Sequence, residues 1–175
     1  MLATTAEDIK KLREETSCGV IDCKKALEES KGDFNKAKDL LRKRGLEMAA
    51  KKSDRVAKEG RVETYIHNGN KIGVLLEVNC ETDFVARSED FIKFTKDVAM
   101  HIAAMNPKYI KQEDVPADVL AKEADKDAFI KANCLLSQPY VREASKSIQD
   151  LLNELVSKIG ENTIVGRFSR FKIGE

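Results

Sequence analysis

The sequence predicts an α+β protein, with a helical N-terminal domain and a three-stranded antiparallel sheet packed with helices. Three observations lead to this fold class. Apolar residues recur at helical spacing over 1–45, apolar and polar residues alternate over 61–80, and the remainder combines amphipathic stretches with a C-terminal segment rich in β-forming residues. We therefore divide the 175-residue chain into a helical domain (1–45), a linker (46–60) and an α+β core domain (61–175).

The N-terminal domain is expected to contain three short helices. Thr5, with Asp8 three residues later, resembles a capping box for the first helix, and "TSCG" at 16–19 ends it. Asp33 suits the cap of the third helix, and Gly45 suits its end. The apolar positions of the second and third helices are Val20, Cys23, Ala26 and Leu27, and Phe34, Ala37, Leu40 and Leu41. Because this core is small, we expect the domain to be tethered to the rest of the chain rather than deeply docked.

The stretch from Arg42 to Arg61 is basic, with eight basic residues against three acidic ones and no bulky apolar core. Charge runs of this length usually form a solvated face, so a helical or extended connector is the commoner explanation. A basic stripe that contacts RNA is the alternative.

The clearest strand signal lies in residues 61–80. "RVETYIH" and "KIGVLLEVNC" alternate apolar and polar residues, and the "NGN" between them is typical of a tight hairpin turn. A long amphipathic helix follows, for which Ser88 is a suitable cap. Its apolar stripe consists of Phe91, Phe94, Val98, Ile102 and Met105.

Two further helices and a third strand complete the predicted core. One helix begins near Pro116, since helices tolerate proline in their first turn. Another has Ser147 and Asp150 as cap partners and ends at Gly160. The final stretch, "NTIVGRFSRFKI", is rich in β-forming residues, and its imperfect alternation indicates a bulge or burial on both faces.

Composition restricts the class of protein. Lys and Arg number 31 against 30 for Asp and Glu, so no excess charge points to nucleic acid or a membrane as partner. The four cysteines form no C-x-x-C pair, and His67 and His101 lie far from Cys18 and Cys23 in sequence, which argues against a metal site and favours free thiols in a reducing compartment. The start "MLATTAEDIKK" has no apolar run of signal-peptide length, and we expect a cytoplasmic protein.

No catalytic motif is found. "GLEMAAKKS" is the nearest match to a phosphate-binding loop, but Ala50 replaces its second glycine and a helix rather than a strand is expected before it. His101 falls in the middle of a long helix and His67 at a hairpin tip, where structural roles are common. We therefore expect a binding protein that is not an enzyme and needs no cofactor.

The stretch "NCETDFVAR" at 79–87 joins the second predicted strand to the long helix. In one interpretation, Thr82 or Asp83 caps the helix and Phe84 packs back onto the sheet. In the other, Phe84 projects as an aromatic anchor for a partner, with Asp83 fixing the backbone or a partner group. Sequence spacing alone leaves both interpretations open.

At this stretch the chain resembles a known family, bacterial elongation factor Ts, the nucleotide exchange factor for elongation factor Tu. "KKLREETSCGVIDCKKALEES" is similar to the family's N-terminal domain, which has a three-helix ubiquitin-associated-type fold. "AAKKSDRVAKEG" resembles its linker, "GVLLEVNCETDFVAR" its signature strand and turn, and "KIGENTIVGRFSRF" its terminal strand. Ser88, where many members have Asn, and "SCGV" at 17–20, where "GAGM" is more typical, depart from the family pattern.

The resemblance implies a partner and the residues that bind it. The expected contacts with elongation factor Tu, in its GDP-bound and nucleotide-free forms, are Thr82, Asp83, Phe84, Val85, Arg13, Val20, Ile21 and Lys24. Phe84 would wedge between elements of Tu that flank its magnesium and phosphate site, with Asp83 supporting the insertion. The resemblance also implies a homodimer, because short members lack a second core subdomain, and the stretch between Phe129 and Gln138 looks abbreviated.

Two other functions compete with nucleotide exchange. An RNA-associated protein would act through the basic Arg42–Arg61 stretch, although no aromatic platform for base stacking is evident. A binder of ubiquitin-like proteins would use the three-helix domain, and residues 1–50 would then bind alone.

Overall fold

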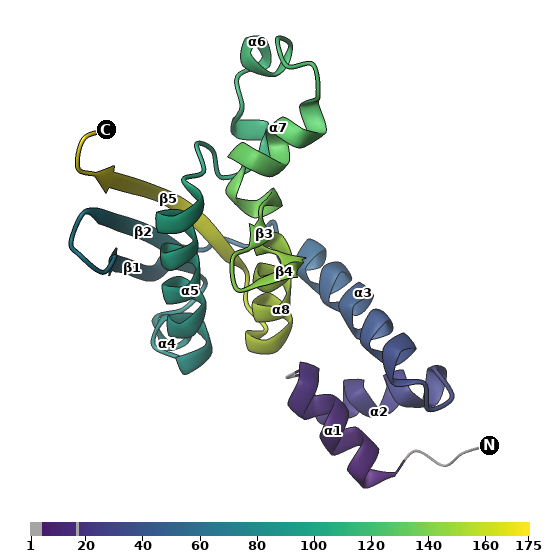
Figure 1. The fold of residues 1–175 in the computed structure, drawn as a ribbon. Coiled ribbons are helices and arrows are strands. Elements are labelled where there is room, and N and C mark those ends of the chain that lie inside the picture. The colour runs from purple at the N-terminus through teal and green to yellow at the C-terminus, as the bar shows by residue number, and fades with distance from the viewer. Residues whose placement is uncertain (1–4, 17) are drawn as a thin grey trace.

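The computed structural model describes residues 5–16 and 18–175, and its mixed α+β architecture confirms the predicted fold class (Figure 1). The first half contains α1 (Ala6–Thr16), α2 (Val20–Glu29), α3 (Phe34–Lys52), β1 (Glu59–Ile66), β2 (Ile72–Cys80), α4 (Asp83–Ala86) and α5 (Glu89–Met105). The second half contains η1 (Gln112–Asp114), α6 (Ala117–Leu120), α7 (Lys126–Asn133), η2 (Leu135–Ser137), β3 (Pro139–Tyr140), β4 (Glu143–Ser147), α8 (Ile148–Ile159) and β5 (Thr163–Lys172), where η marks a short 3₁₀ helix.

The first three helices begin where the sequence predicts. Thr5 and Asp8 form the expected capping box, in which each backbone amide donates to the other residue's side chain at 3.1 Å. Asp33 caps α3, and the break before α2 includes Ser17, which lies outside the described residues. Val20, which shares the predicted apolar face with Cys23, Ala26 and Leu27, is not part of the core: it is the first residue of α2 and its side chain is 51% exposed. The small core of these helices consists of Leu12, Cys23, Ala26, Leu27, Ala37 and Leu41.

Two expectations about α3 are wrong. The helix does not end at Gly45 but continues to Lys52, through half of the predicted linker. It is also docked rather than merely tethered, since it packs along α8 and Arg42 pairs with Asp150 at 2.8 Å. A Cβ atom built on Gly45 would lie 3.7 Å from that of Ser157, so this glycine faces α8 inside a helix-helix contact. The division of the chain into domains stays a prediction.

The main sheet has the order β1-β2-β5 and is antiparallel throughout, as expected. The hairpin between β1 and β2 turns through "NGN", where Gly69 and Asn70 both have positive φ and the Asn70 amide donates to the His67 carbonyl at 2.9 Å. The pairing of β2 with β5 shifts register between Glu77 and Val78. The bulge predicted from the imperfect alternation of the last strand is therefore confirmed.

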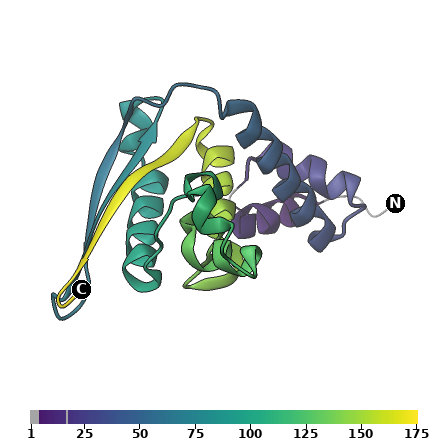
Figure 2. The ribbon, with the colours of Figure 1, turned by 90° about the horizontal axis from the view of Figure 1, so that it is seen from above.

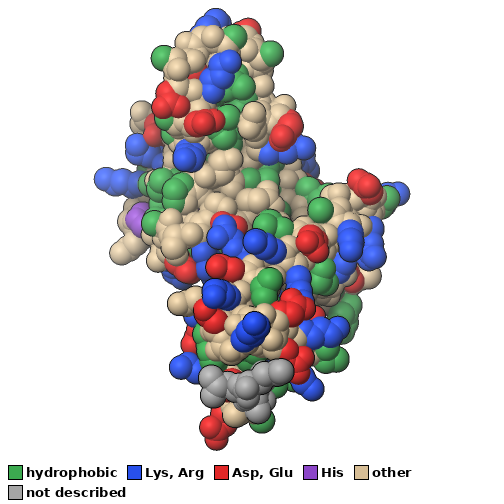
Figure 3. Space-filling view, turned by 90° about the vertical axis from the view of Figure 1, so that its right-hand side faces the viewer, with side chains coloured by type: hydrophobic (Ala, Val, Ile, Leu, Met, Phe, Trp, Pro, Cys, Tyr) green, Lys and Arg blue, Asp and Glu red, His purple; other side chains and the backbone are tan. Residues whose placement is uncertain are grey.

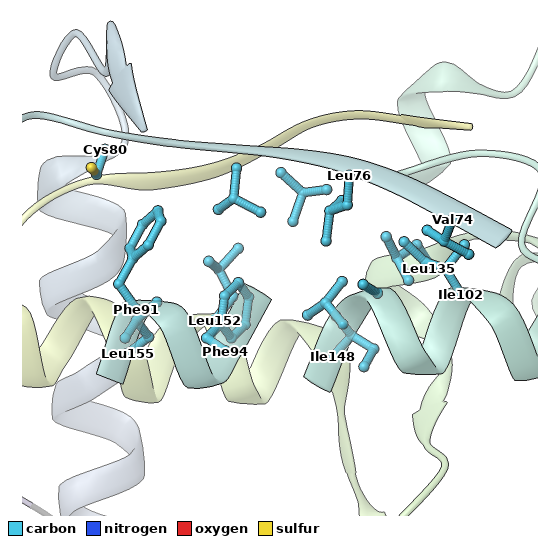
Figure 4. Packing of buried hydrophobic residues seen from close by; sticks show 14 of the residues in the cluster. Val74, Leu76, Cys80, Phe91, Phe94, Ile102, Leu135, Ile148, Leu152 and Leu155 are labelled. Atoms are coloured by element: carbon cyan, nitrogen blue, oxygen red, sulfur yellow. The ribbon is translucent and has the colours of Figure 1, made fainter. Parts of the chain in front are cut away.

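Helices α5 and α8 cover one face of this sheet, which Figure 2 shows nearly edge-on. Ser88 caps α5, Ser147 and Asp150 form a capping box for α8, and Gly160 ends α8 with a φ of 77°, all as predicted. Met105, the last member of the predicted α5 stripe, remains 43% exposed. Figure 4 shows the core between the layers, with Val74, Leu76 and Cys80 from β2, Phe91, Phe94 and Ile102 from α5, and Ile148, Leu152 and Leu155 from α8.

The segment between α5 and α8 differs most from expectation. The single helix expected to begin near Pro116 is two short helices, α6 and α7, because Asp125 starts a new helix by accepting the Ala128 amide at 2.9 Å. The sequence pattern also did not predict the small antiparallel pair of β3 and β4. This segment has its own cluster of buried side chains, Val115, Ile130 and Cys134.

A buried polar group fastens this segment to α5. The fully buried His101 ring bonds through Nε2 to the Gln138 side chain at 2.9 Å, and its Nδ1 accepts the Val141 amide at 3.3 Å. Burial lowers the pKa of His101, and the hydrogen bond to Gln138 opposes this shift only in part. The expectation of a structural histidine agrees with these contacts.

Candidate partner-binding site

The turn between β2 and α5 contains two helix starts within seven residues. Thr82 caps α4 by accepting the Val85 amide at 3.4 Å, and Ser88 caps α5 by accepting the Phe91 amide at the same distance. Only four residues, Asp83–Ala86, lie between these caps in helical conformation. The sequence thus builds a single helical turn held at both ends.

This geometry decides between the two interpretations of Phe84. Val85 and Ala86 are buried in the main core, whereas Phe84 is 86% exposed, the largest value among the large apolar side chains of residues 5–16 and 18–175. Successive helical residues point in different directions, so burying Val85 and Ala86 turns Phe84 outward. The interpretation in which Phe84 packs onto the sheet is wrong. Of its two candidate caps, Thr82 and Asp83, Thr82 is a cap, but of the short α4 rather than of the long helix α5, which Ser88 caps.

Asp83 lies beside Phe84 and pairs with Arg87, one turn further on, at 2.7 Å. Both side chains are more than half exposed, so the pair contributes little to stability. The carboxylate at the start of α4 and its paired guanidinium therefore belong to the same short turn as an exposed aromatic ring.

Glu161, 79 positions from Thr82, and the neighbouring Cys80 support this turn, and the sequence patterns assigned neither of them that role. Glu161 accepts hydrogen bonds from the amide and the hydroxyl of Thr82 at 3.0 and 2.7 Å. The Cys80 thiol donates to the Thr82 carbonyl at 3.2 Å. Burial, with the charge of Glu161 as the next cause, raises the pKa of Cys80 to about 11, so this thiol stays protonated at neutral pH.

The second group of predicted contact residues lies on α1 and α2. Ile21 is 69% exposed and, like Val20, presents an apolar side chain to solvent at the start of α2. Arg13 and Lys24 are exposed as well, and Lys24 pairs with Glu28 at 3.9 Å. The structure does not bring this group into contact with Phe84, although α4 and the α1–α2 pair both lie in the lower half of Figure 1.

In the basic Arg42–Arg61 stretch the arginines are paired, whereas its four lysines form no ion pair among the described residues. Its four arginines all pair with carboxylates, and the face shown in Figure 3 intersperses basic and acidic side chains. The pairs are Arg42–Asp150, Arg44–Glu29, Arg55–Glu81 and Arg61–Glu63, with N–O distances of 2.8, 2.5, 3.5 and 3.0 Å.

Metal and membrane sites have no support in the described part of the chain. Within residues 5–16 and 18–175, no cluster of three or more His, Cys, Asp or Glu side chains is placed to hold a metal ion. All four cysteines are free, and three of them are buried. Among the helices of these residues, none is long and apolar enough to cross a bilayer.

The face of the main sheet opposite the helices carries several exposed apolar side chains. The register places Val62 and Ile66 of β1, Leu75 of β2 and Phe171 of β5 on this outer face, because their immediate neighbours on each strand point to the core. These four side chains are between 48% and 71% exposed. The outer face therefore combines these four apolar side chains, which have no covering layer, with polar ones, among them Thr64, Ser169 and the Glu77–Arg167 ion pair.

These features define a class of protein: a three-helix N-terminal unit joined to an α+β core whose strand-to-helix turn exposes one aromatic side chain. The family model for elongation factor Ts matches residues 3–128, which is more than half of the chain. The chain belongs to the elongation factor Ts family.

Similar proteins support this assignment over almost the whole chain. Elongation factor Ts of Caldanaerobacter subterraneus subsp. tengcongensis is 50% identical over 194 aligned positions, covering 98% of this chain and 97% of the relative. Those of Thermodesulfovibrio yellowstonii and Moorella thermoacetica are 48% and 46% identical, covering 99% and 97% of this chain and 98% and 95% of their own lengths. Since this chain has 175 residues, at least 19 of the 194 positions belong to the first relative alone. The chain is thus abbreviated somewhere; that this lies between Phe129 and Gln138 stays a prediction.

Proposed function

We propose that this chain is a guanine-nucleotide exchange factor that binds GDP-bound elongation factor Tu and promotes release of the GDP. Phe84 inserts near the magnesium and phosphate site of Tu, Asp83 supports the insertion, and GTP then rebinds and displaces the factor. Membership of the elongation factor Ts family supports this role. The observation that carries the mechanism is Phe84 itself, an 86% exposed ring on a turn whose next two residues are buried.

The physical basis is a coupling between two binding sites. A GTPase holds its nucleotide largely through phosphate-loop and magnesium contacts. A factor that distorts those contacts weakens the binding of GDP, and by reciprocity GDP weakens the binding of the factor. No covalent chemistry is required, so the proposal includes a protein that is not an enzyme, needs no cofactor and acts in the cytoplasm beside the translation machinery.

The contact surface in this proposal has two parts. Thr82, Asp83, Phe84 and Val85 form the inserting turn, with Val85 anchoring it from the core side. The exposed side chains of Arg13, Val20, Ile21 and Lys24 form a second contact on the three-helix unit. An apolar pair flanked by two cations suits a partner surface that is itself partly apolar and partly acidic.

The test is the release rate of a fluorescent GDP from elongation factor Tu, with the native chain and with Phe84→Ala. Burying the exposed 86% of Phe84 is worth about 2 kcal/mol, so the variant should lose about 30-fold in exchange efficiency. Met105→Ala is the matched control, because Met105 is also exposed and apolar but lies at the far end of α5. Equal rates for the native chain and Phe84→Ala would discard the wedge, and no acceleration by the native chain would discard the exchange function.

We further propose that the chain forms a homodimer through the outer face of its sheet. An apolar sheet face without a cover is ordinarily buried against a second layer. A twofold-related copy would supply that layer, since the patch of Val62, Ile66, Leu75 and Phe171 would pack against the same patch of the copy.

The competing functions make different predictions. Binding to RNA through the Arg42–Arg61 stretch predicts a steep salt dependence that is lost when Lys51, Lys52 and Arg55 are neutralised. The pairing of the arginines with carboxylates disfavours it. A binder of ubiquitin-like proteins would need only the three-helix unit, whereas exchange needs both parts of the chain.

A further inference from the structure

The base of the Phe84 turn is tied to the segment between α8 and β5. The Glu161 carboxylate accepts two hydrogen bonds from Thr82, one from the amide at 3.0 Å and one from the hydroxyl at 2.7 Å. The two residues are 79 positions apart in sequence, so this is a tertiary contact rather than a local helix cap. The same hydroxyl oxygen accepts the Val85 amide at 3.4 Å.

These bonds act on an element that has little stability of its own. Helix α4 has four residues, far fewer than an isolated helix needs. Hydrogen bonds to a carboxylate are stronger than neutral ones. A hydroxyl that donates to a carboxylate also becomes a better acceptor, so Glu161 strengthens the cap that Thr82 provides.

A second set of hydrogen bonds, made by Asn162, joins the residues after α3 to the base of the Phe84 turn. The Asn162 amide donates to the Glu81 carboxylate at 2.7 Å, and its side chain donates to the carbonyls of Arg55 at 2.7 Å and Ser53 at 3.3 Å. Asn162 is buried. The end of α3, the end of β2 and the turn after α8 therefore meet beneath the Phe84 turn. Among the residues that join them, Glu161 bonds to Thr82 at the N-terminus of α4.

We propose that Glu161 is a positioning residue for nucleotide exchange, one that acts through Thr82 to keep Phe84 directed outward before the partner arrives. This inference rests on the proposed function. Holding the turn in its binding conformation removes the entropy that would otherwise be lost when Phe84 is immobilised against the partner. Glu161 itself acts on the partner only through the turn.

Glu161→Gln is the decisive variant. A glutamine keeps the size of the side chain, but it has one acceptor oxygen and no charge, so at least one of the two bonds to Thr82 is lost. Glu154→Gln is the matched control, because Glu154 lies on α8 and forms its ion pair with Lys146, away from the turn. Three quantities are measured well below the melting temperature of every variant: hydrogen exchange of the Thr82 and Val85 amides, the rate of fluorescent GDP release from elongation factor Tu at saturating factor, and that rate with Phe84→Ala also present.

The expected result is faster exchange of both amides and about tenfold slower GDP release in Glu161→Gln, with the control unchanged. In the Phe84→Ala background, Glu161→Gln should cause no additional loss, because its effect passes through Phe84. A purely structural role would slow release in both backgrounds. GDP release that is insensitive to Glu161→Gln, or equally reduced with and without Phe84, would overturn the positioning role alone. A native chain that fails to accelerate release would instead overturn the proposed function, and this role with it.

Discussion

Replacing Leu75 by lysine should dissociate the proposed homodimer while leaving the protomer folded. Leu75 lies on β2, the central strand of the main sheet, opposite Thr64 of β1 and Ser169 of β5. Its side chain points to the outer face and is 48% exposed in the protomer. A lysine there can lay its aliphatic stem on the sheet and keep its ammonium in water, so long as no second layer covers it.

The magnitude follows from these exposures. In the protomer, the free energy of unfolding should fall by less than about 1 kcal/mol, since half of the leucine is already in solvent. In a dimer, each Leu75→Lys copy loses about 1 kcal/mol of binding free energy, because the exposed half of the leucine is no longer buried by the partner. Each copy must also desolvate or displace the lysine ammonium, at a cost of about 1 kcal/mol or more. Two copies per dimer bring the total to about 4 kcal/mol, which weakens association about 1,000-fold.

The assay is sedimentation velocity or light scattering over a range of micromolar concentrations, combined with urea unfolding of each variant. The native chain should have the mass of a dimer and Leu75→Lys that of a monomer. Met105→Lys, which adds the same charge at an exposed apolar position on α5, should remain dimeric. A native chain of monomer mass refutes the homodimer, whereas a dimeric Leu75→Lys refutes the sheet face as its interface.

Three further predictions concern stability, each measured by urea unfolding. Because burial lowers the pKa of His101, the unfolded chain takes up a proton near the ordinary pKa of 6.5, whereas His101 in the folded chain takes it up only at a lower pH. The free energy of unfolding should therefore fall as the pH drops from 7.5 to 5.5, and His101→Gln should flatten that slope. Gly60→Ala should lower the free energy of unfolding by about 2 kcal/mol or more, since φ is 151° and the new Cβ would lie 2.3 Å from the Val78 carbonyl oxygen. An unchanged free energy of unfolding would mean that the start of β1 moves easily to make room. Gly45→Ala should raise the free energy of unfolding by up to about 1 kcal/mol, because the position is helical and the nearest atom of α8 would lie 3.7 Å from the new Cβ. A lower free energy of unfolding would show that the contact between α3 and α8 tolerates no added methyl group.

Local patterns account for the elements that were predicted well. The capping pairs Thr5–Asp8 and Ser147–Asp150 and the "NGN" turn all depend on residues within a few positions of one another, and each is found where it was expected. The exposure of Phe84 was not decided by such patterns. Its outward direction follows from which neighbours the core buries, and the core is assembled from strands and helices across the whole chain.

The residues that support the site were even harder to predict from local sequence patterns. Glu161 follows a helix-ending glycine, and nothing in its immediate sequence distinguishes it from any other charged turn residue. Its importance appears only when the turn after α8 folds against Thr82. Gly45 is a similar case, because a glycine after a run of helical residues is typical of a helix end until a second helix is seen packing against it.

The sequence by itself determined the fold class, the start of most helices, the three strands and the family to which the chain belongs, because these depend on periodicity, capping residues and contiguous motifs. Only the tertiary structure decided that α3 continues and docks on α8, that the arginines of the basic stretch pair with carboxylates, and that Phe84 faces solvent above a polar junction. The physical reason is range. Hydrogen bonds and side-chain periodicity within one element depend on neighbouring residues, whereas burial, tertiary hydrogen bonds and ion pairs depend on partners as far as 79 and 108 positions away.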